Sequence, residues 1–167
     1  MIDTPHTSRQ TPLHYACRLL NPSIDLLRAL LQHGAAREAE DDQKQLPLRL
    51  AVKNGNPAMV LSLIENIEWS IRKQDKYGKT ALHNAARAGN TAMAECLLSV
   101  IRKVLDLERS DTYEDLERYV NIRHTRGKTT LHHAVEEAPI GLFNSLFDSS
   151  ANPNLTDNEG NTVLHSL

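Results

Sequence analysis

Apolar residues recur at helical spacing along most of the chain, and short polar segments separate these stretches. The spacing predicts a pair of helices over residues 12–19 and 23–33, and a further helix over residues 57–66. One stretch is longer, because residues 91–108 keep an uninterrupted apolar stripe. The pattern therefore predicts short helices joined by polar turns, with one extended helix near the middle of the chain.

A second, shorter helix is expected directly after the extended one. Asp111 and Glu114 have the spacing of a capping box, which satisfies backbone N–H groups at the start of a helix. Apolar residues then continue at helical spacing over residues 112–119. We expect residues 99–119 to form an insertion that decorates the molecule without interrupting its main body.

A four-residue motif occurs five times, as TPLH, LPLR, TALH, TTLH and TVLH. The copies begin at positions 11, 46, 80, 129 and 162, so they lie 35, 34, 49 and 33 residues apart. The segments in front also repeat, as DKYGKT, HTRGKT and DNEGNT. A fixed period of this length indicates tandem units that stack side by side, and the long spacing of 49 residues holds the insertion.

The first copy, Thr11 to Ala16, reads TPLHYA and carries the ankyrin motif T-P-L-H-x-A in full. LLQHGA at residues 30–35 matches the usual end of the second ankyrin helix. The sequence thus resembles the ankyrin-repeat family over nearly its whole length. The resemblance implies an all-α solenoid of helix-turn-helix units with short hairpin fingers. It has about four full repeats and a partial fifth, with the extended helix and the short extra helix inserted after the third.

We expect one domain over residues 1–167. Its units are residues 7–37, 41–74, 75–120 with the insertion, 121–156 and a partial unit at 157–167. The fifth unit breaks off inside its first helix, which favours a chain cut from a longer protein over one closed by a short helical stub.

Within each unit the motif Thr is expected to cap the first helix, and the motif His is expected to join it in a hydrogen-bond network between neighbouring repeats. The residues in these structural roles are Thr11, His14, Thr80, His83, Thr129, His132, Thr162 and His165. In the second unit Leu46 and Arg49 replace the Thr and the His, so the cap bond is lost at a cost of about 1 kcal/mol. We expect burial of Leu46 between units, or an ion pair of Arg49 with Asp41 or Asp42.

Two chemical alternatives to the repeat concern residues 127–133. GKT at residues 127–129 resembles the end of a phosphate-binding loop, but Ile122 stands where that loop needs another glycine. His132 and His133 resemble a metal pair, but adjacent residues point about 100° apart on a helix and no nearby Cys or carboxylate completes the ligands. We therefore expect no cofactor, no metal and no catalysis in these residues.

Composition narrows the range of partners. The net charge is −2 and aromatics are only 4%, which disfavours nucleic acid. Cys17 and Cys96 fit buried, reduced thiols, and neither a signal peptide nor a membrane span is visible. We expect a monomer that is cytoplasmic or otherwise intracellular, with no membrane association.

A basic surface is the predicted partner site. By the register of the ankyrin family, variable positions at the finger tips and late in the first helix contact partners. The selected residues are Lys53, Lys76, Tyr77, Lys79, Arg87, Arg126, Lys128 and Glu136. They predict a protein–protein interaction module that binds an acidic protein segment, although a merely solvated face has the same composition. The alternative is a targeting domain of a larger enzyme with its catalytic part beyond Leu167, such as a bacterial effector that acts in the host-cell cytosol.

Overall fold

The computed structural model describes residues 8–19, 23–64, 68–108, 112–137 and 140–166. Every regular element within these ranges is helical, as the ankyrin resemblance implied, and none of them is long and apolar enough to cross a membrane. The elements are α1 (Pro12–Arg18), α2 (Ile24–Gln32), α3 (Pro47–Lys53), α4 (Pro57–Ile64), η1 (Glu68–Arg72), α5 (Ala81–Arg87), α6 (Thr91–Glu108), α7 (Thr112–Val120), α8 (Thr130–Glu137), α9 (Ile140–Phe147) and η2 (Val163–Ser166).

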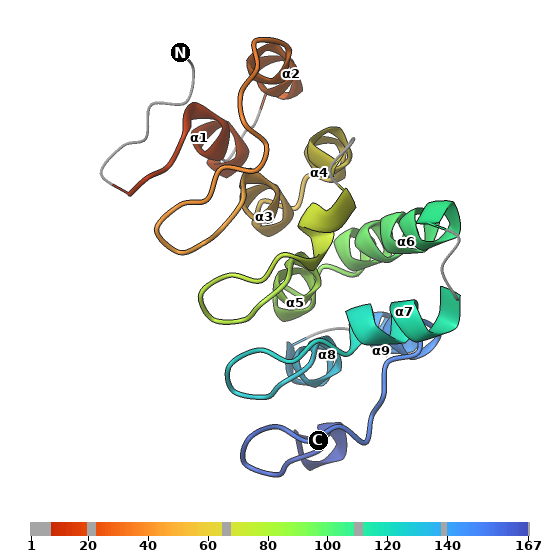
Figure 1. The fold of residues 1–167 in the computed structure, drawn as a ribbon. Coiled ribbons are helices and arrows are strands. Elements are labelled where there is room, and N and C mark those ends of the chain that lie inside the picture. The colour runs from red at the N-terminus through yellow and green to blue at the C-terminus, as the bar shows by residue number, and fades with distance from the viewer. Residues whose placement is uncertain (1–7, 20–22, 65–67, 109–111, 138–139, 167) are drawn as a thin grey trace.

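The helices form two parallel rows, and hairpin loops project from one side of the stack (Figure 1). The first row holds the first helix of each unit, and these helices contact one another in the order α1, α3, α5, α8 and η2. The second row holds α2, α4, α6 and α9, with η1 packed against both α4 and α6. We call the hairpin loop in front of each first helix a finger. The predicted solenoid of helix-turn-helix units is confirmed.

The core lies between the two rows and is built from the repeated motif. Its leucine and the alanine three residues later are at most 3% exposed in each of the first four units (Leu13, Ala16, Leu48, Ala51, Leu82, Ala85, Leu131 and Ala134). Full burial of one leucine side chain contributes about 1.5–3 kcal/mol, and the small alanine lets the first helices approach closely. Leu46, which replaces the capping Thr, is also buried, at 3% exposure. Burial of Leu46 was one of the two expectations for the second unit, and it is confirmed.

The motif Thr and His form a capping pair at the start of the helix. The Thr11 backbone N–H donates to His14 Nδ1 at 3.1 Å, so this nitrogen is an acceptor and the ring proton lies on Nε2. His14 Nε2 then donates to the carbonyl oxygen of Gln45 in the next finger, at 3.0 Å. The same Thr–His pair occurs at α5, α8 and η2. His132 Nε2 makes the corresponding contact with the Asn161 carbonyl oxygen at 3.2 Å, so in these two units the motif histidine connects a helix cap to the neighbouring unit. His83 Nε2 has no hydrogen-bond partner among the described residues.

The insertion extends the second row without separating the units beside it. Helix α6 continues to Glu108, and α7 packs against it. Val120 at the end of α7 is fully buried, and the Arg72 guanidinium of η1 lies 4.5 Å from the centre of the Tyr119 ring. Helices α5 and α8 still contact each other directly across the insertion. The capping box expected at Asp111 and Glu114 lies outside the described residues.

Candidate partner-binding groove

An acidic side chain organises the backbone of most fingers. In the third unit, Asp75 Oδ1 accepts the backbone N–H groups of Tyr77 and Lys79, each at 2.9 Å. Asp41 and Asp157 make the same two contacts in their own fingers. Because these bonds fix the turn, the side chains at the tip project from an ordered backbone.

Neighbouring fingers are bonded to each other as well. Each finger donates one backbone N–H to a carbonyl oxygen of the finger before it: Asp42 to Ser8 at 3.2 Å, and Lys76 to Gln43, Thr125 to Tyr77 and Asn158 to Arg126 at 3.0 Å. The fingers of the stack therefore form one continuous hydrogen-bonded ladder. Their spacing is set by the stacking of the units.

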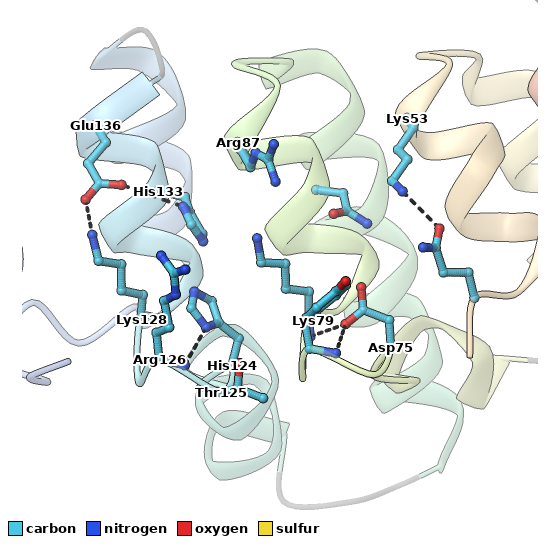
Figure 2. Close-up of a pocket in the computed structure, with 13 residues that line it drawn as sticks. Lys53, Asp75, Lys79, Arg87, His124, Thr125, Arg126, Lys128, His133 and Glu136 are labelled. Atoms are coloured by element: carbon cyan, nitrogen blue, oxygen red, sulfur yellow. Dashed lines mark hydrogen bonds and ion pairs between the residues drawn. The ribbon is translucent and has the colours of Figure 1, made fainter. Parts of the chain in front are cut away.

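The fingers and first helices of the second to fourth units enclose a groove of about 560 Å³ (Figure 2). Its lining is Gln45, Lys53, Asp75, Tyr77, Lys79, Asn84, Arg87, His124, Thr125, Arg126, Lys128, His133 and Glu136. Seven of the eight residues selected from the sequence lie there. The exception is Lys76, whose Nζ lies 4.9 Å from the centre of the half-exposed Tyr77 ring.

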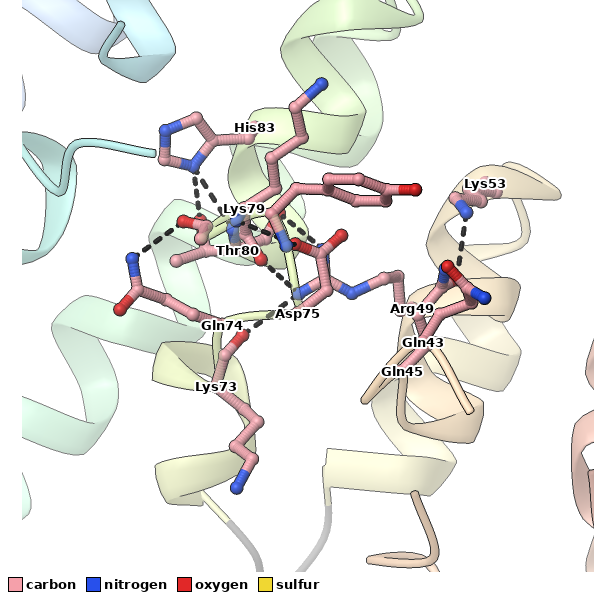
Figure 3. A network of polar contacts seen from close by, with 12 residues as sticks. Gln43, Gln45, Arg49, Lys53, Lys73, Gln74, Asp75, Lys79, Thr80 and His83 are labelled. Carbon is pink, nitrogen blue, oxygen red and sulfur yellow. Dashed lines mark hydrogen bonds and ion pairs between the residues drawn. The ribbon is translucent and has the colours of Figure 1, made fainter. Parts of the chain in front are cut away.

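One of the two carboxylates in the groove is committed to the fold. Asp75 Oδ2 pairs with buried Arg49 Nη1 at 3.1 Å, and Arg49 Nη2 also donates to the Lys79 carbonyl (Figure 3). The expectation that Arg49 pairs with Asp41 or Asp42 is therefore wrong. Arg49 replaces a motif histidine, and like those histidines it reaches forward into the next finger, whereas Asp41 bonds the backbone of its own finger.

The second carboxylate, Glu136, accepts from Lys128 Nζ and lies 3.7 Å from His133 Nδ1. Lys53 Nζ donates to the side-chain oxygen of Gln45 at 2.9 Å. Among the described residues, the side-chain cations of Lys79, Arg87 and Arg126 have neither an ion-pair partner nor a hydrogen-bond partner. The groove thus carries an excess of positive charge that the fold does not neutralise.

The remaining cations repel one another. Burial lowers the pKa of Lys79, and the nearby guanidinium groups of Arg87 and Arg126 lower it further, against an opposing effect of Asp75. Figure 2 shows Lys79, Arg126 and Lys128 rising from the finger loops toward the level of Arg87 and His133. An anion bound among them would relieve this repulsion.

Three histidines meet where α5 faces the fourth unit. The ring centre of His124 lies 5.3 Å from that of His133 and 5.8 Å from that of His83. Burial lowers the pKa of His133 to about 4, and Lys79 and His124 add to the effect. Burial likewise lowers the pKa of His83 to about 3, and it lowers that of His124 with help from Lys79. All three rings are therefore neutral near pH 7.

His124 was not selected from the sequence, although a signal was present. It stands where the other fingers have Asp, as HTRGKT beside DKYGKT and DNEGNT shows. Its Nδ1 accepts the Arg126 backbone N–H at 2.9 Å, so it reproduces one of the two aspartate contacts without the negative charge. Asn84 and His133 were not predicted either. Both directly follow the motif histidine, whereas the predicted contact positions lie at the finger tips and late in the first helix.

Metal-ligating and nucleophilic groups were the two kinds of catalytic candidate that the sequence offered. No group of three or more potential metal ligands occurs in the part of the chain that the structure describes. Burial raises the pKa of the Cys17 thiol to about 12, which removes its nucleophilic form at neutral pH. The groove itself presents hydrogen-bond donors and cations along its lining.

Comparison with known proteins places these features in a family. The model for ankyrin repeats (3 copies) matches residues 2–72 and 48–157. The B-cell lymphoma 3 protein homolog of Mus musculus is 28% identical over 99% of this chain and 34% of its own length. A putative E3 ubiquitin-protein ligase, XBAT31 of Arabidopsis thaliana, is 30% identical over 89% of this chain and 31% of its own length.

The transient receptor potential cation channel subfamily A member 1 homolog of Caenorhabditis elegans is 26% identical over 99% of this chain and 12% of its own length. The chain thus spans about a third or less of these relatives. The match of the family model covers most of the sequence and agrees with the stacked units, the motif caps and the fingers. The chain belongs to the ankyrin-repeat family.

Proposed function

We propose that this chain is a protein-interaction module that binds an acidic segment of a partner protein in the groove between its fingers and first helices. Ankyrin repeats are generally protein–protein interaction modules. The observation that carries the finer proposal is the set of three cations, Lys79, Arg87 and Arg126, that the fold leaves without counter-charges. Complementary charge steers association and fixes the register of a partner.

The shape of the groove favours a protein segment. It is open and runs across several units, so it can accept an extended chain. Tyr77, which is 50% exposed at a finger tip, adds an aromatic contact of the type enriched in binding hot spots. A nucleic acid fits less well, because the net charge is −2 and stacking aromatics are scarce.

Reversal of charge in the groove tests the proposal. We would capture proteins from a lysate of the source cells with the wild-type chain and with the variant Lys76→Glu, Lys79→Glu, Arg126→Glu. A matched control reverses the same number of charges at exposed positions outside the groove, at Arg28 of α2, Lys103 of α6 and Arg118 of α7. Acidic proteins retained by the wild type and the control, but lost from the groove variant, support the proposal. An identical set from all three chains refutes it.

A second candidate is a recruiting role inside a larger enzyme. It is favoured by the similarity to a putative ubiquitin ligase of which this chain matches 31%. The groove would then hold the substrate protein while another domain acts on it. The reading frame that encodes the chain tests this directly, since the candidate requires a further domain in the same frame.

A further inference from the structure

We propose that the groove holds a phosphorylated side chain of its protein partner, with the phosphoryl group between Lys79, Arg87 and Arg126. This inference rests on the proposed function, because it assigns a chemistry to one point of the same docking surface. It goes further by distinguishing a phosphoryl group from a carboxylate.

Unpaired polar groups line this part of the groove. Beside the three cations, Asn84 Nδ2 and His133 Nε2 are buried and have no hydrogen-bond partner among the described residues. The side chains of both residues line the groove and are at least nine-tenths buried. Buried polar groups are normally paired, so unpaired ones at a cavity wall point to a ligand that supplies acceptors.

The charge balance favours a phosphoryl group. A carboxylate brings one negative charge and two oxygens, which leaves two of the three positive charges unbalanced. A phosphorylated serine or threonine carries a charge of about −1.5 to −2 near pH 7 and has three strongly accepting oxygens. A guanidinium group can donate two parallel hydrogen bonds to such oxygens. Arg87 approaches from α5 and Arg126 from the fourth finger, on different sides of the groove.

The fourth finger removes the charge that would repel such a group. Where three other fingers carry an aspartate, this one carries His124, which keeps a backbone contact and is neutral near pH 7. Because its Nδ1 accepts the Arg126 N–H, its proton lies on Nε2, which is a donor. The exchange of an anion for a donor occurs in the finger that also carries Arg126 and Lys128.

Two substitutions of His124 give a matched test. Both His124→Asp and His124→Asn retain a side-chain acceptor for the turn, and Asp is the residue found in the other fingers. They differ by one negative charge beside the proposed phosphoryl position. A third variant, Asn144→Asp at an exposed position of α9, adds the same charge outside the groove and serves as the control.

The binding probes are three labelled peptides that share an acidic flanking sequence and carry Ser, Glu or phosphoserine at the centre. Fluorescence polarisation at constant ionic strength measures their affinities. We expect the phosphoserine peptide to bind at least about tenfold more tightly than the Glu peptide, because charge-assisted bonds to two arginines are added. We also expect His124→Asp to bind it at least about tenfold more weakly than His124→Asn does, and Asn144→Asp to behave as wild type.

Inorganic phosphate provides a probe that does not depend on peptide sequence. Added to the wild-type chain, it should shift the histidine NMR signals of His124 and His133, whereas acetate at the same ionic strength should not. The inference is overturned if phosphoserine and Glu peptides bind equally, or if no peptide binds and phosphate shifts neither signal. If the phosphoserine and Glu peptides bind equally, and both bind more tightly than the Ser peptide, the inference fails but the proposed function stands.

Other phosphate carriers are distinguished in the same assay. A single-stranded oligonucleotide and vesicles that contain phosphoinositides are offered as competitors of the phosphoserine peptide. Competition by either at peptide-like affinity, with the same loss in His124→Asp, would overturn the assignment to a phosphorylated protein segment. Failure of both competitors, together with the peptide result above, supports it.

Discussion

The buried histidines predict that the fold loses stability when the pH falls from 7 to 5. The pKa of His133 is lowered from its ordinary 6.5 to about 4, chiefly by burial, and that of His83 is lowered to about 3. Below pH 6.5 the unfolded chain therefore binds protons that the folded chain does not. The penalty is absent above pH 6.5, grows as the pH falls, and is complete only near the folded pKa values.

The size of the loss in unfolding free energy follows from the pH range over which only the unfolded chain binds the protons. From pH 6.5 to pH 5 each histidine contributes about 2 kcal/mol, since each pH unit is worth about 1.4 kcal/mol when only the unfolded state binds the proton. The two histidines together reduce the free energy of unfolding by about 4 kcal/mol. The variant His133→Asn carries the residue that the third unit has at the equivalent position, Asn84. In this variant the loss should fall to about 2 kcal/mol.

Urea unfolding followed by circular dichroism at pH 7 and at pH 5, in phosphate-free buffer, measures both differences. His83 is left unchanged because its ring is part of a helix cap. Equal stability of the wild type at the two pH values would refute the reasoning. So would a His133→Asn chain that loses as much stability as the wild type, because the buried ring would then not be the source of the effect.

Three further predictions concern the fold. Arg49→Ala should cost about 3–5 kcal/mol in urea unfolding, because it leaves a buried carboxylate unpaired; a cost below about 1 kcal/mol would contradict the network in Figure 3. Gly34→Ala should cost about 1–2 kcal/mol, since the residue has φ +84° and open space around it. Gly127→Ala, at φ +77°, should cost clearly more, because its Cβ would lie 2.7 Å from the backbone nitrogen of Asn158, and equal costs would contradict this. Cys17, buried with a pKa of about 12, should react with iodoacetamide only at the rate of global unfolding; rapid labelling of the folded chain would show otherwise.

The features that could be predicted from the sequence are those that repeat locally. Leu13, Ala16 and their equivalents are buried in every full unit because the period of the motif matches the turn of the helix. The end of α1 was misplaced by one residue, since Leu19 has φ −60° and ψ 140° and is already extended. Such ends depend on the connection that follows and carry little local signal.

Contacts between units were harder to predict. The partner of Arg49 lies 26 residues further along the chain, and acidic residues occur in both neighbouring fingers. The choice between them depends on the direction of the side chain relative to the next unit, which the motif histidines could have indicated. The cluster of His83, His124 and His133 forms across the insertion, so its members are separated by a segment whose path the sequence does not specify.

The hydrogen-bonded ladder of the fingers sets a fixed spacing between the charges that the groove presents to its ligand. Cationic side chains in successive fingers stand one repeat step apart, and backbone hydrogen bonds between the fingers hold that step. A partner is then selected by the distance between its charged residues along an extended backbone, as well as by their number. Substitutions that alter packing between first helices should therefore change which spacing is accepted, even where no groove residue is touched.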